Sequence, residues 1–260
     1  MNILYIDPYK LNEIPQMIAA THYESYTLTI WTGTENFNDY DVIAVGANEG
    51  GIFNINTILA DLVVAHNNGV GVFLAHDCPQ NTHDEQFDRG GLDPCLYTNE
   101  SCIIAQRPNF LTNLQTLGIA AGFSTANINY VMYTDIEVLD SKHTIFNSPF
   151  DIHTISTCQE THNNGIVLSE SCNILARRIG QGPIGQGPTE PIVGSTDSTN
   201  YHIALFEDNL IEDQQHGKVI YYAGGHNNYG KCSEIPSIEE SQLLVNMLNY
   251  IALVKDQEVA

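Results

Sequence analysis

Apolar runs and amphipathic stretches alternate along the first third of the chain. Runs of apolar, β-branched and aromatic residues bounded by Gly, Pro or Asn are typical of strands, and they occur at Asn2–Asp7, Tyr26–Trp31, Tyr40–Gly46 and Val70–Ala75. Between them, Leu11–Thr21 and a stretch that Asn56 can cap have helical periodicity. This alternation predicts an α/β fold with a doubly wound, mainly parallel sheet of the flavodoxin-like type.

The pattern is less regular from residue 80 to residue 200 and becomes clear again near the end. We expect a helix at Asn109–Leu117, an extended segment at Asn129–Leu139, a hairpin loop at Glu160–Gly165, and short strands at Ile166–Leu168 and Asn173–Arg178. Further strands are predicted at Tyr201–Phe206 and Gly217–Ala223. Ser237 and Glu240 have the spacing of a capping box ahead of a final amphipathic helix.

Polar, chemically capable residues follow three of the predicted strands. Glu49 comes after Tyr40–Gly46, His76 and Asp77 come directly after Val70–Ala75, and His226 comes after Gly217–Ala223. In an open α/β sheet, ligands bind outside the carboxyl ends of such strands. We therefore predict a pocket lined by Glu49, His76, Asp77 and His226, covered by a long loop at Asn81–Cys102.

Two kinds of chemistry are compatible with these residues. Imidazole and carboxylate bind divalent metal ions, and His76, Asp77 and His83 form the candidate metal set. The same groups can instead exchange protons with a ligand hydroxyl. Cys78 is also a candidate thiol nucleophile with His226 or His76 as its base, although a small buried residue followed by a turn at Pro79 explains it as well. Histidines at strand ends are also common as structural residues.

Composition narrows the class of partner. The 260 residues carry 31 acidic and 9 basic side chains, a formal net charge of -22. This charge argues against nucleic acid or an anionic membrane surface as the partner, and no apolar run approaches the ~20 residues that span a membrane. The start of the chain has no basic leader and reads as a strand, so we expect a cytoplasmic protein with reduced cysteines, folded as a single domain over residues 1–260, with homo-oligomerisation left open.

Four segments, in this order, resemble the ThuA-like (trehalose-utilisation) branch of the class I glutamine amidotransferase-like superfamily. The similarity lies in YDVIAVGANEGG (Tyr40–Gly51), NNGVGVFLAHD (Asn67–Asp77), KHTIFNSPFDI (Lys142–Ile152) and GKVIYYAGGHNN (Gly217–Asn228). The third segment is similar to a family segment built on His-Pro-Ile, with Thr144 in place of the usual proline. The resemblance implies the amidotransferase-like fold and a connection with carbohydrates.

The sequence departs from glutamine amidotransferases at the residues that perform their reaction. Those enzymes carry a nucleophilic cysteine in a Gly-x-Cys-x-Gly elbow and a downstream His-x-Glu, whereas His76 occupies the elbow position here and no His-x-Glu follows the late strand. The resemblance therefore implies no glutaminase activity. Two functions stay open: an enzyme that acts on a carbohydrate or related small polar molecule, and a non-catalytic binding or scaffolding domain that kept the fold.

Overall fold

The computed structural model describes residues 1–7, 13–46, 55–75, 115–179, 203–207, 216–222 and 237–252, and for residues 120–135, 156–167 and 178–179 it describes the backbone alone. The strands of this part of the chain form one nine-stranded sheet in the order β2-β1-β3-β4-β9-β8-β7-β5-β6. Their bounds are β1 (Asn2–Ile6), β2 (Thr27–Ile30), β3 (Val42–Val45), β4 (Gly71–Ala75), β5 (Ala120–Val138), β6 (Ile155–Leu168), β7 (Cys172–Ile179), β8 (Ile203–Phe206) and β9 (Val219–Tyr222).

The sheet has a parallel half and an antiparallel half. The strands β2, β1, β3, β4 and β9 run parallel to their neighbours, and β4 lies between β3 and β9 as the buried run Val70–Ala75 predicts. The strands β8, β7, β5 and β6 are joined through antiparallel pairs. The predicted α/β class is confirmed, but the sheet is mixed, and the expected parallel order is confined to five strands.

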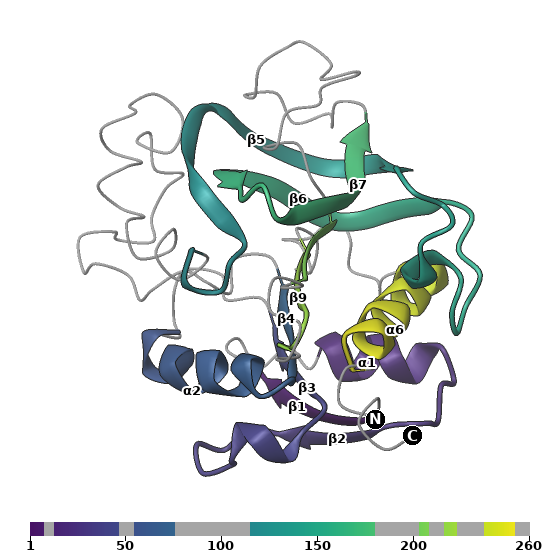
Figure 1. Ribbon diagram of the computed structural model, residues 1–260. Helices are drawn as coiled ribbons and strands as arrows, with labels where there is room; N and C mark the ends of the chain where they lie inside the picture. Colours follow the sequence, from purple (N-terminus) through teal and green to yellow (C-terminus); the bar gives the residue numbers. More distant parts are fainter. Residues whose placement is uncertain are drawn as a thin grey trace, which may run out of the picture.

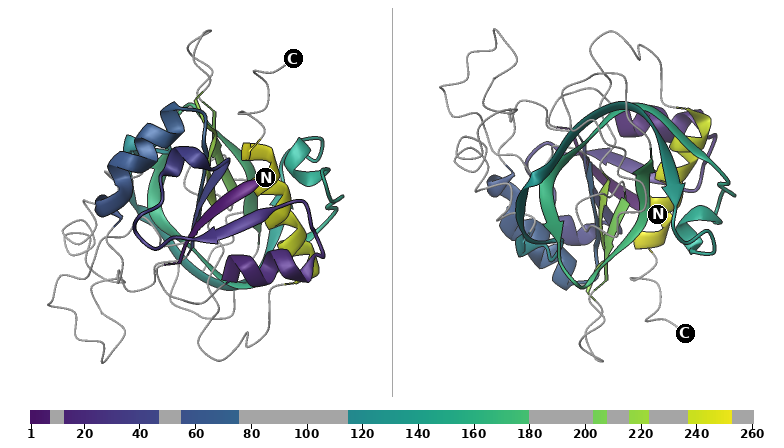
Figure 2. Two further views of the ribbon diagram at one scale, coloured as in Figure 1. Left: turned by 90° about the horizontal axis from the view of Figure 1, so that it is seen from below. Right: turned by 90° about the horizontal axis from the view of Figure 1, so that it is seen from above.

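Helices cover both faces of the parallel half. The described helices are α1 (Glu13–Ala20), α2 (Asn56–Asn67) and α6 (Ile238–Ala252), with short 3-10 turns η1 (Phe37–Asp39) and η3 (Thr144–Phe146). Figures 1 and 2 show α2 on one side of the strands and α1 with α6 on the other, while β5 and β6 form a long curved ribbon beyond β9. No described helix is long and apolar enough to cross a membrane.

Alternation along the strands divides the interior into two cores. Successive side chains of a strand point to opposite faces, so Ile3 and Tyr5 of β1 pack with α1 and α6, whereas Leu4 and Ile6 pack with α2. On the α6 side the contact is close, because a Cβ added to Gly71 of β4 would lie 2.6 Å from the carbonyl oxygen of Ile251. The glycine at the start of β4 therefore allows α6 to lie directly on the sheet.

Two local predictions are wrong. Asn56 does not cap α2: Ile55 is the N-cap residue, its side chain is fully buried, and no side-chain hydrogen bond caps the helix there. The segment Glu160–Gly165 is not a hairpin loop, because it lies within β6, where His162 pairs with Tyr130 of β5. Backbone pairing with β5, rather than an apolar pattern, defines this strand.

Candidate functional site

Three neighbouring parallel strands end at the same edge of the sheet. Val45 near the end of β3 pairs with Leu74 of β4, and Ala75 at the end of β4 pairs with Tyr222 at the end of β9. Adjacent strands lie about 4.8 Å apart, so the ends of β3 and β9 are separated by roughly 10 Å. We call this the carboxyl edge of the sheet.

The residues that the sequence singled out follow these strand ends. Glu49, His76, Asp77, His83 and His226 all lie outside the described residues. So do Cys78 and the segment Asn81–Cys102, which was expected to cover the pocket. Their convergence therefore stays a prediction. The described part of the chain does bring together Gly46, Ala75 and Tyr222, the positions from which the chain continues toward Glu49, His76 and His226.

A tyrosine and a carboxylate that the sequence analysis did not single out lie at the end of β1, beside β3. The buried Tyr5 hydroxyl donates to the Asp7 carboxylate and accepts a hydrogen bond from the backbone N–H of Ile14. Burial, followed by the nearby charges of Asp7 and Glu13, raises the pKa of Tyr5 far above its usual range. Tyr5 is thus a fixed donor that orients the half-buried Asp7 at the carboxyl edge.

Gly46 makes room for this arrangement. It follows β3, and its backbone N–H donates to the carbonyl of Ile6 at 2.9 Å. A Cβ added at this position would lie 2.8 Å from the Tyr5 hydroxyl oxygen, closer than real Cβ contacts allow. The glycine that the sequence analysis assigned to a strand end therefore allows the tip of Tyr5 to approach β3.

A second pair of this kind lies at the end of β9. The Tyr222 hydroxyl donates a hydrogen bond to Glu240 Oε1 in the first turn of α6, and both residues are buried. The backbone N–H of Glu240 donates to Ser237 Oγ at 3.1 Å, which confirms the Ser237 half of the predicted capping box. The Glu240 carboxylate accepts from the strand, so the pair ties the end of β9 to the start of α6.

These contacts define what the described residues can do at the carboxyl edge. An oriented carboxylate such as Asp7 can accept a hydrogen bond from a ligand hydroxyl or take up its proton. The signal for it was present in the sequence, because Tyr5 and Asp7 are two residues apart in a strand and so lie on the same face. No group of three His, Cys, Asp or Glu side chains that could hold a metal ion occurs among the described residues.

Comparison with known proteins identifies the fold. No protein-family profile matches the chain, and no curated protein is similar to it in sequence. A cytoplasmic protein from Salmonella typhimurium superimposes with a TM-score of 0.59 at 10% identity, covering 96% of this chain and 99% of that one. PurLQS from Thermotoga maritima gives a TM-score of 0.52 at 11% identity, over 96% of this chain and 98% of that one.

A third structure belongs to the branch that the sequence resembles. A ThuA-like protein from Bacteroides uniformis superimposes with a TM-score of 0.50 at 14% identity, covering 96% of this chain and 90% of that one. The chain therefore shares the overall α/β fold of these structures. At these identities the likeness extends to the fold alone.

Proposed function

We propose that the chain is a ThuA-like domain that binds or acts on a sugar, or a related neutral polar molecule, at the carboxyl edge of its sheet. The observation that carries the proposal is the adjacency of β3, β4 and β9, which run parallel and end at one edge. Ligands of open α/β sheets bind at such edges. The chain continues from these ends toward Glu49, His76, Asp77 and His226.

Each proposed residue has a role that its chemistry supports. His76 and His226 would exchange protons with ligand hydroxyls, and Glu49 and Asp77 would accept hydrogen bonds from them. Asp7 follows β1, the strand beside β3, and is oriented by Tyr5. It adds a further carboxylate at the carboxyl edge, and unlike the other four it belongs to the described residues. If a divalent ion takes part, we propose His76, Asp77 and His83 as its ligands.

We further propose that glutamine is not a substrate. Amide hydrolysis by this superfamily requires a thiolate at the elbow position, which His76 occupies in this chain. The acidic composition supports a partner that is neither nucleic acid nor membrane. A cytoplasmic location and a single domain remain part of the proposal, with homo-oligomerisation left open, and the free thiol of Cys172 is compatible with a reducing compartment.

Isothermal titration with a panel of neutral mono- and disaccharides that includes trehalose, and separately with Zn²⁺, tests the site. We expect His76→Ala and His226→Ala each to abolish the binding that the unmodified chain shows, with the thermal midpoint nearly unchanged. His153→Ala is the matched control, because His153 is largely exposed and pairs with Asp151 of its own segment. Unfolding by the first two substitutions would make both histidines structural and overturn their proposed role.

Product analysis separates the two classes of function. An enzyme converts the bound sugar, and the His76→Ala chain leaves it intact. A binding or scaffolding domain returns the sugar unchanged after prolonged incubation with the unmodified chain. In the same series, ammonia released from glutamine by the unmodified chain but not by Cys78→Ala would contradict the absence of glutaminase activity.

A further inference from the structure

Four chemically active side chains meet at the opposite edge of the sheet, where β8 ends and β9 begins. Glu207 directly follows β8, Lys218 directly precedes β9, Tyr250 lies in the last turn of α6, and His143 is the N-cap residue of η3. They come from four separate elements. This cluster lies at the other end of β9 from Tyr222, and the proposed ligand site does not involve it.

The contacts within the cluster centre on Tyr250. Its hydroxyl donates to Glu207 Oε1 at 2.8 Å, and Lys218 Nζ lies 3.1 Å from the same oxygen. The Lys218 ammonium also lies 3.7 Å from the centroid of the Tyr250 ring, a cation–π distance. The imidazole of His143 packs on the same tyrosine, with ring centroids 4.8 Å apart.

His143 combines this packing with a second contact that depends on its protonation state. Its Nδ1 atom accepts a hydrogen bond from the backbone N–H of Ile145 at 3.3 Å, which caps the η3 turn. Only an imidazole whose Nδ1 carries no proton can accept this bond. The neutral form of His143 therefore supplies the side-chain cap of the turn while its ring packs on Tyr250.

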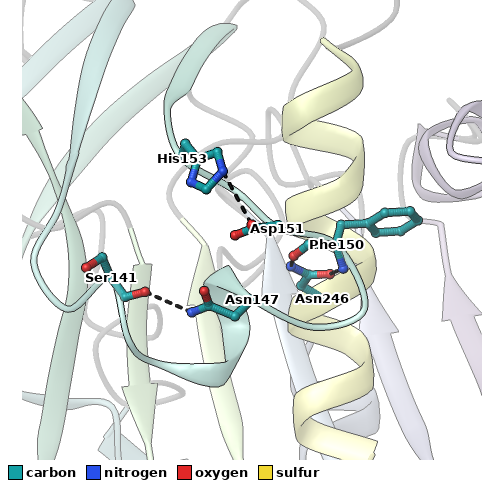
Figure 3. A network of polar contacts seen from close by, with 6 residues as sticks. All are labelled: Ser141, Asn147, Phe150, Asp151, His153 and Asn246. Atoms are coloured by element: carbon teal, nitrogen blue, oxygen red, sulfur yellow. Dashed lines mark hydrogen bonds and ion pairs between the residues drawn. The ribbon is translucent and has the colours of Figure 1, made fainter.

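The rest of the segment is attached to α6 independently of pH. The buried side chain of Asn246 donates to the carbonyls of Ile145 and Phe150 at 2.8 and 2.7 Å, and it accepts from the backbone N–H of Phe150 at 2.9 Å. Figure 3 shows Asn246 reaching from α6 to the backbone of Phe150, with Asp151 and His153 further along the same segment. Asn246 does not titrate, so these bonds persist on acidification.

We propose that His143 is an acid-sensitive latch. Protonation of Nδ1 removes the acceptor of the Ile145 N–H and releases residues 140–144 from Tyr250, while Asn246 keeps residues 145–150 on α6. The charged groups that face the imidazole among the described residues are Asp140 on its own segment, Glu207 after β8 and Lys218 before β9. Glu207 already accepts a hydrogen bond from Tyr250 and pairs with Lys218, so its attraction stabilises the protonated imidazole of His143 only in part.

The direction of the pH effect follows from proton linkage. Burial is the largest influence on His143 and lowers its pKa below the usual 6.5, an effect that Lys218 reinforces and that Glu207 and Asp140 oppose. The released histidine then binds a proton more readily than the latched one. The latch is fully closed above about pH 6.5, the ordinary pKa of histidine, and loses stability as the pH falls from there toward the lower pKa of the latched state.

Nuclear magnetic resonance on the intact chain tests the latch. We expect the His143 ring protons to titrate below pH 6.5. We also expect the Ile145 amide, corrected for its intrinsic rate, to exchange roughly two- to tenfold faster once His143 is protonated, the change expected from losing one hydrogen bond. In His143→Gln this acceleration should disappear. His153→Gln, which removes an exposed histidine of the same segment, should retain it.

Two results would overturn the proposal. One is titration of His143 at or above the ordinary pKa of histidine, and the other is acid acceleration of Ile145 exchange that is as large in His143→Gln as in the unmodified chain. The first measurement uses the unmodified protein alone, so it decides the question even if His143→Gln fails to fold. Neither measurement involves a sugar or Zn²⁺, so failure of the latch and failure of the proposed ligand site are distinguishable.

Discussion

The two ends of α6 are each tied to the sheet by a tyrosine–glutamate hydrogen bond, in different surroundings. At the carboxyl edge, Tyr222 of β9 donates to Glu240 of α6, and both residues are buried. About 15 Å further along the helix, Tyr250 of α6 donates to Glu207 after β8. The second glutamate also has Lys218 at 3.1 Å, and the side chains of this ion pair are 22% and 19% exposed.

The difference shows how burial changes the contribution of a tyrosine–glutamate hydrogen bond to stability. A buried carboxylate that loses its donor bears the full cost of its removal from water, whereas one with a nearby cation and partial solvent access retains compensation. The Tyr222–Glu240 pair should therefore be essential for the stability of the α6 end that faces the candidate site. The Tyr250–Glu207 pair should tolerate change, which suits an end of the helix where a segment can attach and detach.

The largest expected effect comes from removing the hydroxyl groups of Tyr222 and Tyr250 in separate variants. Tyr222→Phe should lower the free energy of unfolding by about 2 kcal/mol, because the buried Glu240 carboxyl group loses the hydrogen bond from Tyr222. Tyr250→Phe should cost about 1 kcal/mol or less, since Lys218 still pairs with Glu207. Urea unfolding of both variants measures the two values. Equal costs, or a larger cost at Tyr250, would show that burial does not distinguish the two ends.

Lys218→Met sharpens the comparison by removing the cation and keeping the apolar stem. We expect a loss of about 1–2 kcal/mol, from the ion pair with Glu207 and the cation–π contact with Tyr250. Because the pair is partly exposed, the difference between the variant and the unmodified chain should shrink at 1 M salt. The Tyr222→Phe effect, measured in the same salt series, should stay constant. A salt-independent loss at Lys218 would indicate packing rather than charge.

The parallel half of the molecule was predictable because four of its five strands are buried apolar runs. β1, β3, β4 and β9 all lie within the predicted ranges, and all of their residues except Asn2 are buried. The ribbon of β5 and β6 was predicted only in part, as Asn129–Leu139 and Ile166–Leu168. The polar residues from Glu160 to Asn164 lack an apolar sequence pattern, and their extended form depends on pairing with β5, which local sequence does not encode.

The location of the candidate site was predictable from the sequence, but the hydrogen-bond partners of the side chains around it were not. Strand ends and the residues that follow them can be read from the chain, so the carboxyl edge was found. Glu240 was expected to complete a capping box with Ser237, which lies three residues away. Its carboxylate instead accepts from Tyr222, 18 residues earlier in the chain. Spacing along a helix reveals local partners, whereas a partner on a strand is known only once helix and strand are packed together.

The smallest expected effect concerns the N-cap hydrogen bond at the start of α6, the end of the helix that lies at the carboxyl edge. Ser237→Ala removes the acceptor of the Glu240 backbone N–H, and we expect a loss of about 0.5–1 kcal/mol, typical of an N-cap serine. Ser237→Asp is the matched control, because a carboxylate also accepts this bond and favours the positive end of the helix dipole, so it should restore stability. The cost of Ser237→Ala should add to that of Lys218→Met, because Lys218 contacts Glu207 and Tyr250 at the other end of α6. A double variant that loses markedly more than the sum would show that the two ends of α6 are coupled, and the helix would then transmit changes at the latch to the candidate site.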